Sequence, residues 1–173
     1  MTYHQARFEK TRHQLYQAHD TLVLSEYLQP PSVGTYRVRI EYDTTIQKIE
    51  YLPYIPREIQ HFACVESSFS YAYKSCNREE LHAAIVPNVD DVIFTCKGLL
   101  QDTSIANIAL CIDGHWYTPK KPLLEGTTRA RLLENGMLKA ESLDMKSLQK
   151  AQKFAIMNAL IGFRIIENVL IKE

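Results

Sequence analysis

Two tight-turn signals constrain the fold of this chain more than any other feature. Lys97-Gly98 and Asp113-Gly114 separate three strand-like runs, Asp91–Thr95, Ile108–Ile112 and Trp116-Tyr117. Glycine adopts the left-handed backbone that short connections between antiparallel strands require. This region therefore predicts an antiparallel meander.

The rest of the chain adds helices and further strands. Apolar residues at helical spacing predict a helix from Tyr3 to about Ala18, and alternation from Thr35 to Tyr42 predicts a strand that turns at Asp43-Thr-Thr45 into a hairpin. Further strands are expected at Phe62–Val65 and within Phe154–Ile171, and further helices from Asn77, over Thr127–Glu134 and over Leu143–Lys153. Because strands and helices do not alternate in a βαβ rhythm, we predict an α+β fold with an antiparallel or mixed sheet.

Composition narrows the class of function. The 173 residues are 46% hydrophobic, which is enough for a sizeable core. Twenty basic residues balance twenty acidic ones, so no net charge favours nucleic acid or an anionic membrane surface. No apolar run reaches the roughly 18 residues of a membrane-spanning helix, and the polar N-terminus differs from a signal peptide. We therefore expect a cytoplasmic protein with a small-molecule ligand and neither a nucleic-acid nor a membrane partner.

The cysteines and histidines give no metal-ligand pattern. Cys64, Cys76, Cys96 and Cys111 are widely spaced, and the six histidines lack a paired spacing. Each cysteine lies in or beside an apolar stretch, as a buried reduced thiol would, with a disulfide framework as the alternative. We expect reduced thiols and no metal site.

Three short segments carry the candidate chemistry. They are Tyr71-Ala-Tyr-Lys74-Ser-Cys-Asn77-Arg78, Asp102-Thr-Ser-Ile-Ala-Asn107 and Leu124-Glu-Gly126-Thr127-Thr128-Arg129. A lysine buried among aromatic side chains has a lowered pKa and can form a Schiff base. A carboxylate can keep a heterocyclic nitrogen protonated, and a Gly-Thr-Thr turn that opens a helix can bind phosphate. Pyridoxal phosphate is a cofactor that needs all three groups.

Each candidate also has an ordinary structural interpretation. Lys74 would then be a solvated amine, Asp102 a turn residue that caps backbone amides, and Thr127 a helix N-cap. Arg7 could add a guanidinium to the same phosphate, or be an exposed helix residue. Arg39 could bind a substrate carboxylate, or lie on a solvated strand face. The fixed order of the three segments favours the cofactor interpretation.

These segments resemble motifs of the fold-type IV family of pyridoxal-phosphate enzymes, which includes D-amino-acid and branched-chain aminotransferases and 4-amino-4-deoxychorismate lyase. Lys74 through Arg78 resembles the Lys-x-x-Asn-Arg segment that holds the Schiff-base lysine. Asp102 through Asn107 resembles the segment that begins with the ring-nitrogen acid, which is usually glutamate. Gly126 through Arg129 resembles the Gly-x-Thr-Arg phosphate turn, and His4 through Arg7 is similar to the His-x-x-Arg segment of the phosphate-binding arginine. The resemblance extends from about residue 3 to residue 166.

The resemblance also implies an architecture. It gives Leu124 a backbone contact with the cofactor, and brings Asn158 and Ala159 towards the phosphate. It implies a barrel-like mixed or antiparallel sheet with flanking helices, similar to D-amino-acid aminotransferase. The cofactor-binding domain would cover residues 58–173 and follow a reduced small domain over residues 1–57. Because family members usually begin with about two strands before the His-x-x-Arg segment, the chain looks N-terminally shortened. Family members usually form homodimers, so a homodimer is expected.

The resemblance leaves three functions open. The short, lyase-like members are the most similar, which implies conversion of 4-amino-4-deoxychorismate to 4-aminobenzoate and pyruvate in folate biosynthesis, with Lys74 as acid–base shuttle. An aminotransferase acting on an amino acid would use the same residues. A homologue that binds the cofactor without turnover is the third alternative.

Overall fold

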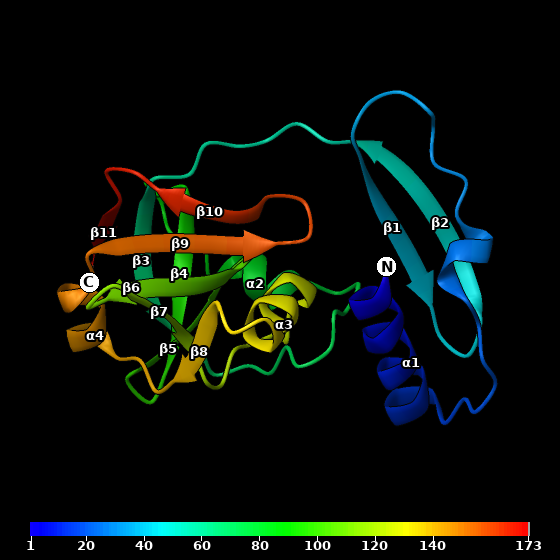
Figure 1. Cartoon of the computed structure of the whole chain (residues 1–173), viewed down its shortest axis with the longest axis horizontal. Helices are drawn as coiled ribbons and strands as arrows, with labels where there is room; N and C mark the ends of the chain where they lie inside the picture. The colour runs from blue at the N-terminus through cyan, green and yellow to red at the C-terminus, as the bar shows by residue number, and fades with distance from the viewer. Residues whose placement is uncertain (173) are drawn as a thin grey trace. The chain divides into compact units, whose positions relative to one another are not determined.

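The chain forms two compact units, one over Met1–Arg57 and one that begins at Glu58. The computed structural model describes residues 1–172. Figure 1 labels their helices and strands. Among these residues, no helix combines the length and the apolar character that crossing a bilayer requires.

The first unit contains one long helix and one hairpin. Its elements are α1 (Thr2–Tyr16), the 3₁₀-helix η1 (Leu24–Tyr27), β1 (Tyr36–Tyr42) and β2 (Ile46–Pro53). The two strands are antiparallel, and the Asp43 carboxylate closes their turn by accepting the Thr45 N–H at 2.9 Å. Aspartate is favoured in turns because its side chain can accept such a bond. The structure therefore confirms the helix and the hairpin predicted from the sequence.

Arg12 is the largest buried side chain of the first unit. Only 1% of it is exposed, and its guanidinium donates to the Thr44 carbonyl, the Asp20 carbonyl and the Asp20 carboxylate. It also lies over the Phe8 ring, 5.3 Å from the centroid. Since one guanidinium satisfies acceptors on two separate loops, Arg12 joins α1 to the hairpin turn and to the segment that follows α1.

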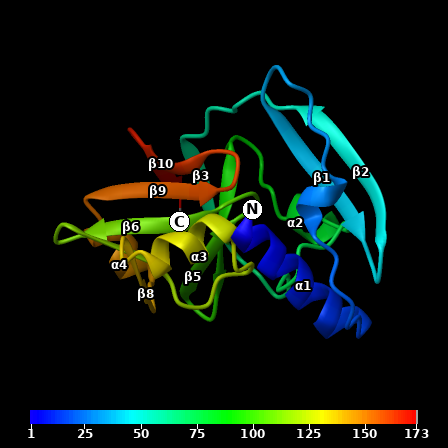
Figure 2. The ribbon, with the colours of Figure 1, turned by 45° about the vertical axis from the view of Figure 1, so that its right-hand side comes forward.

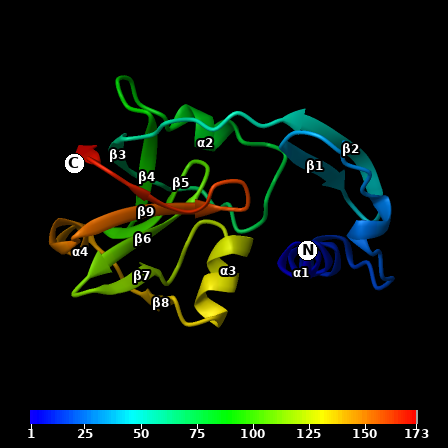
Figure 3. The same ribbon diagram turned by 45° about the horizontal axis from the view of Figure 1, so that its top comes forward.

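The second unit is organised around a nine-stranded sheet. Its strands are β3 (His61–Glu66), β4 (Asp91–Cys96), β5 (Leu99–Thr103), β6 (Asn107–Ile112), β7 (His115–Pro119), β8 (Leu138–Glu141), β9 (Lys153–Asn158), β10 (Gly162–Ile166) and β11 (Leu170–Lys172). The main strand order is β10-β9-β6-β5-β4-β3-β11, with β7 joined to β6 and β8. From β4 to β7 each strand is antiparallel to the next, as Figure 3 shows in green. The antiparallel meander and its two turns are confirmed, but β5, which lies between β4 and β6, was not predicted.

Three parallel pairings make the sheet mixed, one between β3 and β11 and two that are crossovers. β3 and β4 are parallel and are joined across α2 (Glu79–Ala83), while β7 and β8 are parallel and are joined across α3 (Thr127–Glu134). No such strand–helix–strand unit was predicted from the sequence. Both crossover helices were predicted, but the parallel pairing of β3 with β4 and that of β7 with the four-residue strand β8 were not. The predicted α+β class with a mixed sheet is confirmed.

The position of Asp102 also differs from the prediction. The sequence predicted a turn at Asp102, but this residue lies on β5, one residue before the strand ends. The turn is confined to Lys97 and Gly98, whose positive φ angles of 53° and 76° close a two-residue connection. A carboxylate on a central strand is held more rigidly than one in a loop, which matters for the site.

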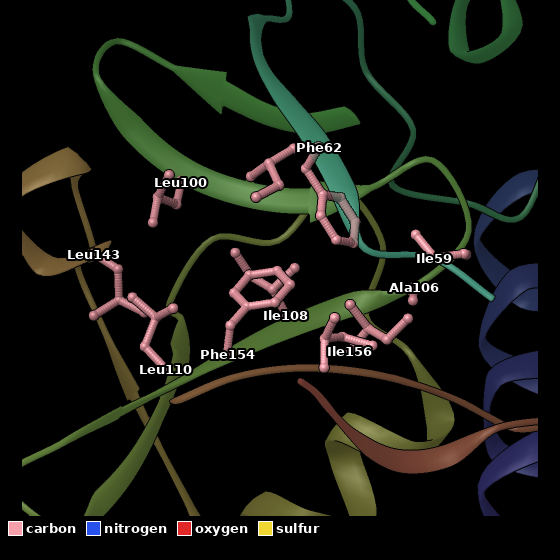
Figure 4. Close-up of a cluster of buried hydrophobic side chains, with 11 residues drawn as sticks. Ile59, Phe62, Leu100, Ala106, Ile108, Leu110, Leu143, Phe154 and Ile156 are labelled. Carbon is pink, nitrogen blue, oxygen red and sulfur yellow. The ribbon is translucent and has the colours of Figure 1, made fainter. Parts of the chain in front are cut away.

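Side chains on both faces of the central strands are buried. On one face, Ile108 and Leu110 of β6 pack with Phe154 and Ile156 of β9 in the cluster drawn in Figure 4. The opposite face carries Ala109, Ala155 and Met157, which pack with Leu132 of α3. Burial of a leucine-sized side chain stabilises a fold by about 1.5–3 kcal/mol. This second face therefore fixes α3 beside β6 and β9, as Figure 2 shows.

Candidate active site

Asp102 and Asn107 lie directly opposite each other at the ends of two antiparallel strands. Their pairing is the register point between β5 and β6. Residues that face each other across antiparallel strands project from the same side of the sheet. The two side chains are 3% and 5% exposed, and Asn107 donates from Nδ2 to Asp102 Oδ1 at 2.7 Å. The register of the hairpin thus forms a buried carboxylate–carboxamide pair.

The second oxygen of Asp102 binds the loop that precedes α3. Its Oδ2 accepts the Leu124 N–H at 2.8 Å. Burial raises the pKa of Asp102 to about 7, while the bonds from Leu124 and Asn107 and the charge of Arg129 act in the opposite direction. A carboxylate in this setting is stabilised by a protonated nitrogen placed beside it.

Asn107 makes two further contacts with the same loop. Its Nδ2 also donates to the Leu124 carbonyl oxygen at 2.8 Å. Its Oδ1 occupies the space that a Cβ on residue 126 would need, so an alanine there would clash with the carboxamide. Gly126 is therefore required for close approach rather than for an unusual backbone, since its φ of −70° is open to any residue.

The N-terminus of α3 presents unpaired donors. The helix begins after Gly126 without a side-chain cap, and Thr127 and Thr128 are 8% and 6% exposed. Across residues 1–172 neither threonine hydroxyl has a hydrogen-bonding partner. The first N–H groups of a helix and the positive end of its dipole bind anions, and threonine hydroxyls can add donors.

Arg129 anchors the other end of the same loop. It is 7% exposed and donates from Nη2 to the Pro119 carbonyl at 2.8 Å, at the end of β7. Burial lowers its pKa, against the charges of Asp102 and Glu125, and its Nε has no hydrogen-bond partner within the described chain. The loop from β7 to α3 is thus held near both ends.

Lys74 lies in the connection between β3 and α2, as the sequence predicted, but its side chain is exposed. The expectation that aromatic neighbours bury it is wrong for the structure. Phe69 instead packs edge-on against Phe94, with ring centroids 5.3 Å apart, and the Tyr71 hydroxyl donates to the Ser75 carbonyl at 3.0 Å. These aromatic residues shape the loop rather than bury the Lys74 side chain.

Arg78 joins the lysine segment to the Asp102 segment. Its Nη2 donates to the Ser104 carbonyl at 2.7 Å, two residues beyond Asp102. Asp102 and Asn107 are in turn hydrogen-bonded to Leu124. Residues 102–107 therefore link all three predicted segments. The structure therefore connects the motifs that the sequence analysis selected.

The remaining candidates have other observed contacts. Asn158 donates to the Ile105 carbonyl at 3.2 Å and accepts the backbone N–H groups of Leu160 and Ile161, so its side chain closes the β9–β10 turn beside Ala159. Arg39 and Arg7 belong to the first unit. Arg39 pairs with Glu41 at 2.6 Å and Glu50 at 3.7 Å, and Arg7 lies half-buried on α1. Their roles towards a ligand stay predictions.

Arg78 and Asn107 are site residues to which the sequence assigned no role of their own. Both stand in the quoted segments, as the last residue of Asn77-Arg78 and of Ala106-Asn107. Their position within these motifs could have identified them. The sequence does not indicate, however, which acceptor each side chain binds. Only the pairing of β5 with β6 reveals it.

The fold and this site define a class of protein. The family model for amino-transferase class IV matches residues 28–169, and the chain belongs to that family. Its members depend on pyridoxal 5′-phosphate, so the chain is a pyridoxal-phosphate-dependent enzyme of fold-type IV. This confirms the resemblance, the fold class and the cofactor predicted from the sequence.

Solved structures give the particular relatives. A candidate 4-amino-4-deoxychorismate lyase from Haemophilus somnus is 28% identical, covers 93% of this chain and 89% of its own, and has a TM-score of 0.83. A candidate amino-acid aminotransferase from Mesorhizobium loti is 20% identical, with 96% and 90% covered and a TM-score of 0.77. The 4-amino-4-deoxychorismate lyase from Pseudomonas aeruginosa is 18% identical, with 99% and 77% covered and a TM-score of 0.72. The last two show the fold alone.

The buried residues fit pyridoxal phosphate. Asp102 is a desolvated carboxylate with a raised pKa, which suits the protonated nitrogen of the cofactor ring. The uncapped start of α3 offers N–H groups and two hydroxyls, which suit the phosphate. The exposed amine of Lys74 is the remaining group that the cofactor needs.

Proposed function

We propose that this protein converts 4-amino-4-deoxychorismate to 4-aminobenzoate and pyruvate. The observation that carries the proposal is its 28% identity and TM-score of 0.83 with the candidate lyase of Haemophilus somnus, across 93% of the chain. The hydrogen bonds that link the three cofactor segments support it, because they hold the groups that this chemistry requires.

Each residue has a proposed role. Lys74 would hold the cofactor covalently through Nζ until the substrate amine replaces it there. The freed Nζ would then accept the proton from the substrate carbon that bears the amine and return a proton to the departing pyruvate. Asp102 holds the proton on the ring nitrogen with its carboxylate. Gly126, Thr127 and Thr128 bind the phosphate, and Arg7 is proposed to add its guanidinium. When bound, the cofactor supplies an electron sink next to the reacting carbon.

Four further residues have proposed positions at the ligand. Leu124 and the Asn158–Ala159 turn would lie beside the cofactor. The carbonyl and amide of Leu124 bond to Asn107 and Asp102, respectively. Arg39 binds the substrate carboxylate, which competes with Glu41 and Glu50 for the same guanidinium. A guanidinium can form two parallel bonds to a carboxylate.

An aminotransferase is the second candidate. Its support is the similarity in fold to the candidate aminotransferase of Mesorhizobium loti, with a TM-score of 0.77. The proposed roles of Lys74 and Asp102 are the same in both reactions, so the substrate decides between them.

Product analysis tests these alternatives. Purified protein loaded with pyridoxal phosphate is given 4-amino-4-deoxychorismate, and 4-aminobenzoate and pyruvate are measured together. Keto-acid formation from a panel of L- and D-amino acids is measured in parallel. The proposal expects equal amounts of 4-aminobenzoate and pyruvate, and none with Lys74→Ala. Keto acids alone would establish the aminotransferase, and cofactor binding without any product would establish the homologue without turnover.

The proposal includes a cytoplasmic homodimer. The family resemblance supports the dimer, and the first unit exposes apolar side chains that a second copy could cover. They are Leu15, Tyr16, Val23, Tyr27, Val33 and Ile55. Light scattering at micromolar concentration tests the dimer, and a strictly monomeric species would contradict it.

A further inference from the structure

One buried carboxamide contacts both ends of the candidate cofactor site. Asn107 donates to the Asp102 carboxylate at 2.7 Å and to the Leu124 carbonyl at 2.8 Å. Its Oδ1 lies against Gly126, which immediately precedes α3. With 5% of its surface exposed, Asn107 has little access to water as an alternative partner.

We propose that Asn107 is a positioning residue that fixes the Asp102 carboxylate and the start of α3 as one unit. This inference rests on the proposed function, because it assigns the two fixed groups to the ring nitrogen and the phosphate of one cofactor. A rigid ligand bound at two points needs a constant separation between them, and a shared buried contact supplies it.

The contacts of Asp102 make the role of Asn107 specific. Asn107 Nδ2 donates to Oδ1 and the Leu124 N–H donates to Oδ2, and the Leu123 backbone also favours the ionised form. The charged group that acts on Asp102 from α3 is Arg129. If Asn107 is replaced, Oδ1 loses its donor while the backbone bond on Oδ2 and the Arg129 charge are retained. The ionised form of Asp102 then becomes less favourable.

Gly126 gives a second way to disturb the same contact. Alanine at this position keeps every hydrogen-bonding group of the site, but its Cβ displaces the Asn107 carboxamide. If Asn107 fixes the Asp102 carboxylate relative to the start of α3, Gly126→Ala alters the titration of Asp102. It does so although no hydrogen bond links residue 126 to that carboxylate.

The experiment uses the full chain, first without cofactor. Carboxyl ¹³C resonances are followed against pH, and the Asp102 signal is identified by its loss in Asp102→Asn. Asn107→Leu and Gly126→Ala are compared with the control Thr118→Val. This control removes a buried hydrogen bond from Thr118 of β7 to the carbonyl of Ile108, which follows Asn107 on β6. The cofactor dissociation constant of each variant is then measured by fluorescence with pyridoxal phosphate.

The expected result has two parts. In Asn107→Leu and Gly126→Ala, Asp102 titrates about one pH unit higher than in wild type. Their dissociation constants for pyridoxal phosphate rise about tenfold or more, which is a loss of about 1.4 kcal/mol. Thr118→Val shifts neither quantity.

Two results would overturn the inference. One is an unchanged Asp102 titration in both variants, and the other is an equal shift in Thr118→Val. If Asn107→Leu fails to fold, Gly126→Ala still decides. Failure of the wild type to bind pyridoxal phosphate would overturn the proposed function instead, while the cofactor-free titration would still report whether Asn107 fixes Asp102.

Discussion

Arg78 donates from Nη2 to the carbonyl oxygen of Ser104 at 2.7 Å, and this bond joins the lysine-bearing loop to the strand end that carries Asp102. The guanidinium also lies over the Tyr71 ring, 5.9 Å from the centroid. Arg78 and Tyr71 both lie within four residues of Lys74 along the chain. The position of the exposed Lys74 amine thus depends on the half-buried side chain of Arg78.

Arg78→Met is expected to loosen the loop that carries Lys74. The Ser104 carbonyl loses a charge-assisted donor, which contributes about 1.5–3 kcal/mol. Hydrogen exchange over residues 67–78 should become faster, and the dissociation constant for pyridoxal phosphate should rise. Arg131→Met, at an exposed arginine of α3, is the control and should leave both unchanged. Unchanged exchange in Arg78→Met would show that the bond does not hold the loop.

The raised pKa of Asp102 predicts a pH dependence of stability in the cofactor-free protein. The folded pKa is about 7 and the ordinary value is 3.8. Between these values the folded state retains a proton that the unfolded chain releases, so stability falls as pH rises from about 4 to about 7. The full effect has an upper limit of about 4 kcal/mol.

Urea unfolding of the wild type and Asp102→Asn at several pH values measures this effect. Asparagine does not titrate, so the unfolding free energy of the wild type should fall relative to Asp102→Asn across that pH range and then level off. A difference between the two proteins that stays constant with pH would exclude a raised pKa at Asp102.

The hydroxyls of Thr127 and Thr128 are expected to select for the phosphate group. Valine keeps their shape and removes the donors, so Thr127→Val and Thr128→Val should each weaken binding of pyridoxal phosphate about tenfold. Binding of pyridoxal, which lacks the phosphate, should not change. Equal losses for both ligands would mean that the substitutions act through folding rather than through phosphate.

Arg12 is expected to control the stability of the first unit. Arg12→Met retains an unbranched apolar chain but leaves the Thr44 and Asp20 carbonyls without their donor. An unsatisfied buried acceptor costs about 1–3 kcal/mol. Limited proteolysis should therefore cleave within residues 1–57 much faster than in wild type. Arg37→Met, at an exposed position of β1, serves as the control, and equal cleavage rates in the two variants would refute this role.

The sequence predicted the fold wherever local chemistry was decisive. Gly98 and Gly114 marked the two turns of the meander, and Thr127–Glu134 was correctly bounded because Asn135-Gly136 ends the helix. The strand β5 was missed because Leu99 and Leu100 form too short an apolar run between a turn and polar residues. The crossover through α2 was missed although its two strands and its helix were predicted, because the sequence does not show that β3 and β4 pair in parallel.

The chemistry of the candidate site was easier to predict than its geometry. Lys74, Asp102 and Gly126 were selected as residue types in a fixed order. What the sequence could not indicate was that Phe69 would pack on Phe94 and leave Lys74 exposed. It also could not indicate that Asn107 would face Asp102, because that relationship depends on the register between two strands.

Covalent attachment of the cofactor tests the central claim most directly. The purified protein is incubated with pyridoxal phosphate, reduced with borohydride, digested and mapped by mass spectrometry. We predict one stable modification, on the peptide that contains Lys74, together with an absorbance band above about 400 nm before reduction. Both signals should be lost in Lys74→Ala. Modification of another lysine at the same occupancy, or no modification at saturating cofactor, would contradict the account.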